Sequence, residues 1–136
     1  MILTDTGPLV ALVNRNDPNY PRCLDVTRRV PAGPLVTTWP CFTEAMYLVF
    51  QAGGYPAQTE LWRWMTAGRL TLHDFTKDEI VQMAALMGKY RDQPMDLADA
   101  SLIVAAERLG MQRIFTLDGD FYIYRLSDGS ALECIP

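Results

Sequence analysis

Short apolar runs along the chain alternate with stretches in which apolar residues recur every three or four positions. The short runs predict β-strands at residues 2–4, 35–38, 70–72, 113–117 and 132–135. The other stretches predict helices at residues 9–13, 20–30, 42–50, 57–66, 77–90 and 97–106. Strands that alternate with helices favour a parallel sheet with helices on both faces. The pattern therefore predicts an α/β fold, a three-layer α/β/α sandwich around a central, mainly parallel sheet.

Residues at the ends of these segments support the predicted boundaries. The glycine pair at 53–54 ends a predicted helix, because glycine is unfavourable in a helix interior. Thr76 and Glu79 have the spacing of a capping box at the start of the next helix. The stretch 97–106 is apolar on nearly every side and is followed by Gly110, so we expect it to be the most buried helix.

Length and composition are those of a globular domain. The chain has 136 residues, of which 49% are apolar and 21% are charged, which suits one domain over residues 1–136. No apolar run is long enough for a transmembrane helix, and the N-terminus lacks the basic region of a signal peptide. The three cysteines have no metal-binding spacing, which favours reduced thiols. We therefore expect a cytoplasmic protein that does not associate with membranes.

Charge is distributed unevenly along the chain. A net charge of −4 argues against a protein that holds nucleic acid by bulk electrostatics. Residues 92–120 contain six acidic and two basic side chains, so this segment alone accounts for the imbalance. The first thirty residues contain four arginines: Arg15, Arg22, Arg28 and Arg29. The sequence thus predicts an acidic pole and a modest basic flank.

Four carboxylates occupy positions where a parallel sheet gathers ligands. Asp5 ends the first strand, and Asp118 ends the strand at 113–117. Glu44 lies near the start of the helix after the second strand, and Asp99 lies in the first turn of the buried helix. Ligands bind beyond the carboxyl ends of parallel strands, so we expect these side chains to meet in one cleft.

Carboxylates that converge in this way repel one another and raise each other's pKa. A divalent cation relieves the repulsion, and oxygen ligands suit Mg²⁺, for which Mn²⁺ can substitute. The single histidine, His73, excludes a histidine-rich zinc site. Mg²⁺ in such a site can activate water for attack on phosphorus. The sequence therefore predicts metal-dependent phosphodiester hydrolysis.

The same residues resemble a known family. The segments that carry the resemblance are Asp5-Thr6, Thr43-Glu44, Asp99-Ala100 and Thr116-Leu117-Asp118-Gly119-Asp120-Phe121. In this order and spacing they resemble the PIN domain, and more narrowly the VapC-type toxins of bacterial toxin–antitoxin pairs, over residues 1–121. The resemblance implies a Mg²⁺-dependent endoribonuclease that a small antitoxin neutralises, and a homodimer is common among similar proteins. It implies catalytic and metal-binding roles for Asp5, Glu44, Asp99 and Asp118.

Neighbouring polar residues have structural as well as functional interpretations. Asp96 occupies an N-cap position, so capping is at least as well supported as metal contact. Asp5 could likewise cap the helix that follows it. Asp120 is either a turn residue or a supporting carboxylate. Thr6 and Thr116 are candidates for positioning a water molecule, although threonines in turns and strands are usually structural.

Three other functions remain as alternatives. The triplet Asp5-Thr6-Gly7 also occurs in aspartic proteases, but their fold is nearly all β, whereas this chain has helical patterns. A haloacid-dehalogenase-like, metal-dependent phosphatase also has an aspartate after its first strand, but Gly7 stands where its second aspartate belongs. A PIN fold without catalysis would be an RNA- or protein-binding module. The presence of all four acids argues against this last alternative.

Overall fold

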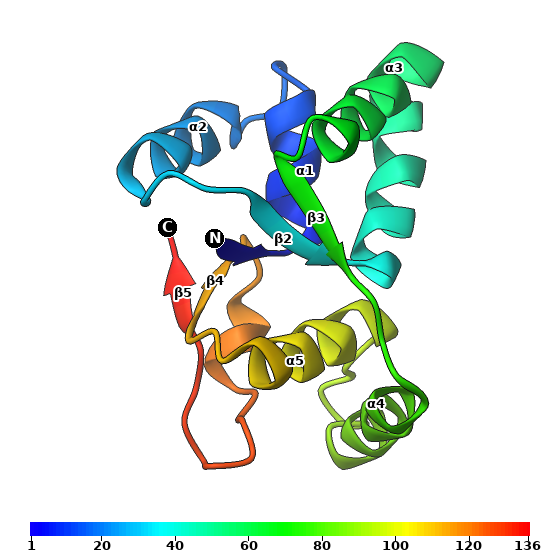
Figure 1. Ribbon diagram of the computed structural model, residues 1–136, viewed down its shortest axis with the longest axis vertical. Helices are drawn as coiled ribbons and strands as arrows, with labels where there is room; N and C mark the ends of the chain where they lie inside the picture. Colours follow the sequence, from blue (N-terminus) through cyan, green and yellow to red (C-terminus); the bar gives the residue numbers. More distant parts are fainter.

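The computed structural model covers residues 1–136 and contains one five-stranded sheet (Figure 1). The strands are β1 (Ile2–Thr4), β2 (Leu35–Thr38), β3 (Leu70–His73), β4 (Arg113–Phe115) and β5 (Glu133–Ile135). They lie in the order β3-β2-β1-β4-β5, and every neighbouring pair is parallel. The predicted α/β fold is confirmed, and the sheet is entirely parallel.

Helices cover both faces of this sheet (Figure 1). They are α1 (Thr6–Val13), α2 (Tyr20–Arg29), α3 (Trp39–Thr66), α4 (Lys77–Lys89), α5 (Leu97–Leu109) and the short 3₁₀ helix η1 (Gly119–Tyr122). Helix α1 packs against α2 and α3 on one face, and α4 packs against α5 on the other. The molecule therefore has the predicted three layers, with β1 in the middle of the sheet.

Helix α1 begins three residues earlier than the apolar pattern predicts. It starts at Thr6, because Asp5 is the N-cap and its side chain accepts a hydrogen bond from the Thr6 backbone N–H at 2.7 Å. Pro8 falls in the first turn, where a missing N–H removes no helical hydrogen bond. The loop between β1 and α1 is thus reduced to Asp5 itself, which fixes the position of this carboxylate.

Helix α3 joins two helices that the sequence predicts separately. Its two halves meet at Gly54, whose φ of 68° and ψ of −159° lie in a region that is essentially restricted to glycine. Pro56 follows in the first turn of the second half, where proline is tolerated. The predicted break at the glycine pair is confirmed, although the first half begins earlier, at Trp39.

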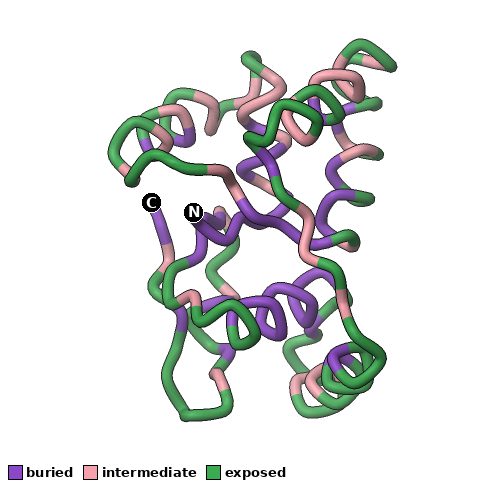
Figure 2. Tube along the Cα trace, viewed as in Figure 1, coloured by how far each residue is buried: buried purple, intermediate pink, exposed green.

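Helix α5 is the most buried helix, as predicted. All nine residues from Ala98 to Ala106 are buried, and the tube along this helix is purple in Figure 2. Leu102 packs in one apolar cluster with Leu3 and Ile114 of the sheet. Asp99 is therefore held in apolar surroundings from the first turn of this helix.

Strand β4 is shorter than predicted, because a turn replaces its last two residues. The strand ends at Phe115, and the Thr116 hydroxyl then accepts a hydrogen bond from the Asp118 backbone N–H at 3.0 Å. This turn leads directly into η1, whose N-cap is Asp118. The turn brings Asp118 to the edge of the sheet where β1 also ends.

Neither a disulfide nor a membrane-spanning helix occurs. Cys23, Cys41 and Cys134 are free thiols, of which the first two are buried and the third is half-buried. No helix combines the length and the apolar character needed to cross a bilayer. The fold is therefore held by its apolar clusters rather than by cross-links.

Candidate functional site

An acidic cleft of about 490 Å³ lies beyond the carboxyl ends of β1 and β4. The starts of α1, α3 and α5 border it, as the topology of a parallel sheet requires. The structure brings the four principal predicted residues into its lining, together with Asp96, which the sequence offers as an N-cap or a metal contact, and with Asp17. These carboxylates are Asp5, Asp17, Glu44, Asp96, Asp99 and Asp118.

Asp5 lies at the base of the cleft and is held on both oxygens. The residue is only 8% exposed. Its Oδ2 accepts a hydrogen bond from the Thr116 hydroxyl at 2.8 Å. Its Oδ1 accepts the Thr6 backbone N–H, so Asp5 is both the N-cap of α1 and part of the cleft. The buried thiol of Cys41 lies 3.9 Å from the same oxygen. Asp5 is thus a fixed carboxylate rather than a mobile surface acid.

Asp99 is the second buried carboxylate and is 6% exposed. Its backbone N–H donates to Oδ1 of Asp96 at 2.8 Å, so Asp96 caps α5 while it also lines the cleft. The Asp99 side chain accepts a hydrogen bond at Oδ2 from the hydroxyl of Tyr124, at 3.0 Å. Its other oxygen accepts no hydrogen bond from the protein and is free for a ligand.

Burial makes both carboxyls hard to ionise. It raises the pKa of Asp5 to about 6 from 3.8, and the negative charges of Asp118 and Glu44 add to this effect. Burial likewise raises the pKa of Asp99 to about 7, with Asp96 as the strongest neighbouring charge. No lysine or arginine forms an ion pair with any acid of the cleft. The negative charges of the site are therefore not balanced by any basic side chain, and a bound cation would stabilise the ionised carboxylates.

The exposed acids are arranged around these two buried ones. Thr6 donates its hydroxyl to Oε2 of Glu44 at 3.2 Å, which holds Glu44 toward the cleft. Carboxylate oxygens of Asp99, Asp118 and Asp120 all lie within 4.8 Å of one another. This group includes Asp120, which the sequence leaves open as a turn residue or a supporting carboxylate, and it does not include Asp5 or Glu44. Carboxylate oxygens are the ligands that hard cations such as Mg²⁺ prefer.

Sequence reasoning missed two residues of this region. Asp17, in the loop between α1 and α2, lines the cleft next to Asn19, whose backbone N–H it accepts at 2.8 Å. Its polar loop carries no pattern that indicates where it folds. Tyr124, which contacts Asp99, lies beyond the last motif of the sequence, and no signal there distinguishes it from an ordinary core tyrosine.

Comparison with known families agrees with the geometry of the cleft. The model of the PIN domain matches residues 2–126, which is most of the chain. The chain belongs to the PIN domain family. This PIN domain is 31% identical over 139 residues to a protein of Mycobacterium tuberculosis named Ribonuclease VapC26, across 99% of this chain and 100% of the relative.

Solved structures agree with this PIN domain in fold. VapC20 of Mycobacterium tuberculosis, described as a Sarcin-Ricin loop cleaving toxin, superimposes with a TM-score of 0.84 at 20% identity, over 100% of both chains. A toxin–antitoxin complex from Klebsiella pneumoniae gives a TM-score of 0.68 at 17% identity, over 89% of this chain and 90% of the other. The predicted resemblance to VapC-type PIN domains is confirmed.

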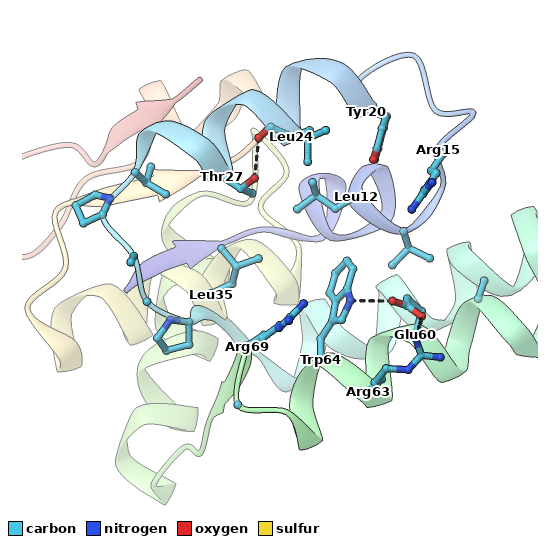
Figure 3. A pocket seen from close by; sticks show the side chains of 18 of the residues that line it. Leu12, Arg15, Tyr20, Leu24, Thr27, Leu35, Glu60, Arg63, Trp64 and Arg69 are labelled. Carbon is cyan, nitrogen blue, oxygen red and sulfur yellow. Dashed lines mark hydrogen bonds and ion pairs between the residues drawn. The ribbon is translucent and has the colours of Figure 1, made fainter.

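A second, larger cavity of about 1130 Å³ lies at the opposite edge of the sheet. It is bordered by Leu35 at the start of β2 and by Arg69 just before β3. Figure 3 shows side chains from α1, α2 and the second half of α3 around it, with Arg63 and Arg69 on either side of Trp64 in this view. Its lining combines apolar side chains, such as those of Leu12 and Leu24, with three arginines and one glutamate.

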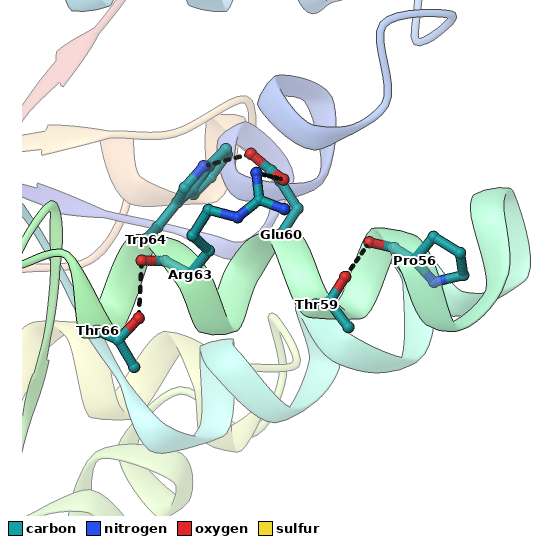
Figure 4. A network of polar contacts seen from close by, with 6 residues as sticks. All are labelled: Pro56, Thr59, Glu60, Arg63, Trp64 and Thr66. Carbon is teal, nitrogen blue, oxygen red and sulfur yellow. Dashed lines mark hydrogen bonds and ion pairs between the residues drawn. The ribbon is translucent and has the colours of Figure 1, made fainter.

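The glutamate of this cavity is already neutralised. Glu60 forms an ion pair with Arg63 at 2.9 Å and accepts a hydrogen bond from the indole N–H of Trp64 at 3.2 Å (Figure 4). Arg15 and Arg69 form no ion pair. The cavity therefore carries a net positive charge, whereas the cleft at the other edge of the sheet is acidic.

Proposed function

We propose that this PIN domain is a Mg²⁺-dependent endoribonuclease and the toxin of a type II toxin–antitoxin pair. The observation that carries the proposal is the cleft in which two buried carboxylates, Asp5 and Asp99, lie beside Glu44 and Asp118 without a basic partner. The relative named Ribonuclease VapC26 supports RNA as the substrate. Similarity to VapC20, described as a toxin, supports the biological role.

The donor set of the cleft fits a divalent cation. Asp5, Glu44, Asp99 and Asp118 would hold Mg²⁺ or Mn²⁺, and Asp120 is available beside the last two. When bound, the ion supplies a Lewis acid for the phosphoryl oxygen and lowers the pKa of an attacking water. A phosphodiester could not approach these acids without that positive charge, because the cleft alone would repel it.

The remaining task of the protein is to orient the carboxylates. The hydroxyl of Thr116 fixes one oxygen of Asp5, and the hydroxyl of Thr6 fixes Glu44. Glu44 and Asp118 are exposed, whereas Asp5 and Asp99 are buried, so the cleft has a solvent-accessible mouth and a rigid base. This gradient lets RNA reach the site from solvent while the two deepest ligands keep their positions.

Cleavage of RNA in the presence of Mg²⁺ or EDTA tests the proposal. We expect cleavage in Mg²⁺, none in EDTA, and a loss of at least about 100-fold in Asp5→Asn and Asp99→Asn, since each removes a charged metal ligand. Asp25→Asn is a matched control, because Asp25 is exposed on α2 and pairs with Arg29 at 2.9 Å, outside the cleft. Circular dichroism checks that all variants fold.

Three outcomes would contradict the proposal of a metal-dependent nuclease. Cleavage that persists in EDTA would exclude a metal-dependent reaction. Binding of RNA without cleavage in any metal would favour the alternative of a catalytically silent module. A covalent phosphate on Asp5 would favour the phosphatase alternative.

We also propose a small antitoxin as the partner of this chain. The toxin–antitoxin complex from Klebsiella pneumoniae, which has a similar fold, supports a partner of this kind. The larger cavity suits an amphipathic segment with acidic residues, because Leu12 and Leu24 offer apolar contacts and Arg15 and Arg69 offer unpaired charges. A homodimer, which the resemblance also implies, stays a prediction for sedimentation analysis.

A further inference from the structure

The buried carboxylate of Asp99 has a hydrogen-bond donor that comes from outside the cleft. The hydroxyl of Tyr124 donates to Oδ2 of Asp99 at 3.0 Å, across 25 positions of sequence. Tyr124 is fully buried and does not line the cleft, so it cannot itself contact a ligand bound there. Its one polar atom is directed at a carboxylate that the proposed function assigns to Mg²⁺.

Two aromatic rings fix the position of Tyr124. Tyr90 packs edge-on against it with ring centroids 5.1 Å apart, and Phe121 does so at 5.3 Å. The hydroxyl of Tyr90 accepts the backbone N–H of Arg125 at 3.0 Å, which ties the residue next to Tyr124 to the end of α4. Edge-to-face pairs of this kind hold rings in defined orientations. The hydroxyl of Tyr124 therefore has a defined place relative to Asp99.

We propose that Tyr124 is a positioning residue for Mg²⁺ binding, in that its hydroxyl holds Oδ2 of Asp99 and leaves Oδ1 directed to the cleft. This inference rests on the proposed function. Asp5 provides a parallel within the same site, because the Thr116 hydroxyl holds its Oδ2 at 2.8 Å. Each buried carboxylate of the cleft is thus held by one hydroxyl from a neighbouring segment. Loss of such an outer hydrogen bond typically weakens metal binding about 10–100-fold.

The variant Tyr124→Phe tests this role, because it removes one hydroxyl and keeps the ring. We expect the Kd for Mg²⁺, measured by isothermal titration calorimetry on the full chain without RNA, to rise about 10–100-fold. Tyr122→Phe is the matched control, since it removes a hydroxyl from a tyrosine two positions away that is 64% exposed and does not line the cleft. We expect its Kd for Mg²⁺ to equal that of the unaltered protein.

A second measurement does not depend on the folding of a variant. Addition of Mg²⁺ to the unaltered protein should perturb the near-ultraviolet absorption of a buried tyrosine, because the hydrogen bond from Tyr124 to Asp99 changes when Asp99 binds the ion. A flat difference spectrum at saturating Mg²⁺ would overturn the inference. An unchanged Kd in Tyr124→Phe, or an equal rise in Tyr122→Phe, would also overturn it, and either result would leave the nuclease assignment intact. Failure of the unaltered protein to bind Mg²⁺ would defeat both.

Discussion

Asp5 and Asp99 link the stability of the metal-free protein to pH. Burial raises their pKa values to about 6 and about 7, from an ordinary value of 3.8. Between the ordinary and the raised values, the folded protein binds more protons than the unfolded chain. Linkage then requires that these two groups lower the free energy of unfolding as pH rises through this window. Their stabilising protons are fully bound below it and are lost above about pH 7.

The variant Asp99→Asn should therefore gain stability relative to the unaltered protein as pH rises. An amide can still accept the hydrogen bond of Tyr124 but has no proton to lose. We expect the difference in Tm between variant and unaltered protein, measured in EDTA, to increase from pH 3.8 to about pH 7. The exposed Asp25→Asn should show no such trend. A difference that shrinks with pH would mean that Asp99 is not held in a desolvated site.

The sequence placed the four principal acids together and singled out Asp96, Thr6 and Thr116 near them, but it gave no sign of Tyr124 or Asp17. Asp5 and Asp118 follow strands, and in a parallel sheet the ends of strands share one edge, so topology alone brings these two together. Tyr124 and Asp17 reach the site from irregular segments, whose course depends on packing rather than on periodicity. No pattern in the sequence therefore indicates that Tyr124 contacts Asp99 or that Asp17 lines the cleft.

At the scale of elements, turn chemistry explains where the apolar pattern succeeded and where it did not. The glycine pair predicted the break in α3, because Gly54 adopts a conformation that other residues avoid. The apolar pattern predicted the start of α1 too late, because Thr6 and Gly7 are not apolar, although Asp5 was a candidate for the N-cap that it forms. Hydrophobic periodicity reports only the apolar positions of a helix, so it does not show that Asp5 begins α1 as its N-cap.

Substitution of alanine for glycine should have opposite effects at the two helical sites Gly54 and Gly88. Gly54→Ala should lower the free energy of unfolding by about 1–3 kcal/mol, because its φ of 68° and ψ of −159° strain any side chain. Gly88 lies within α4 with no atom near an added Cβ, so Gly88→Ala should raise that free energy by about 0.5–1 kcal/mol. Urea unfolding measures both. Equal effects would show that the break at Gly54 is not obligatory.

At the scale of the whole molecule, the fold separates two charged regions to opposite edges of one sheet. The acidic cleft lies beyond the carboxyl ends of the strands, and the arginine-bearing cavity lies near the starts of β2 and β3. Half of the acids that line the cleft come from the acidic segment 92–120 that the sequence singles out, and the other half come from the first 44 residues of the chain. The sequence did not predict that Arg15 would meet Arg63 and Arg69, since these come from distant segments that only tertiary packing brings together.

This separation predicts that partner binding and RNA cleavage can be disrupted independently. Arg15→Glu and Arg69→Glu place negative charge where an acidic segment of the proposed antitoxin would bind, so the Kd for that antitoxin should rise at least about tenfold. Cleavage of RNA by the free protein should stay unchanged, because neither residue lines the cleft.

Arg22→Glu is the matched control, as Arg22 is exposed on α2 and does not line the cavity. Calorimetry at two salt concentrations adds a check on the charge contacts. If Arg15 and Arg69 contact the partner, the affinity of the unaltered protein for the antitoxin must weaken as salt is added. Unchanged affinity in both variants would place the partner on another surface.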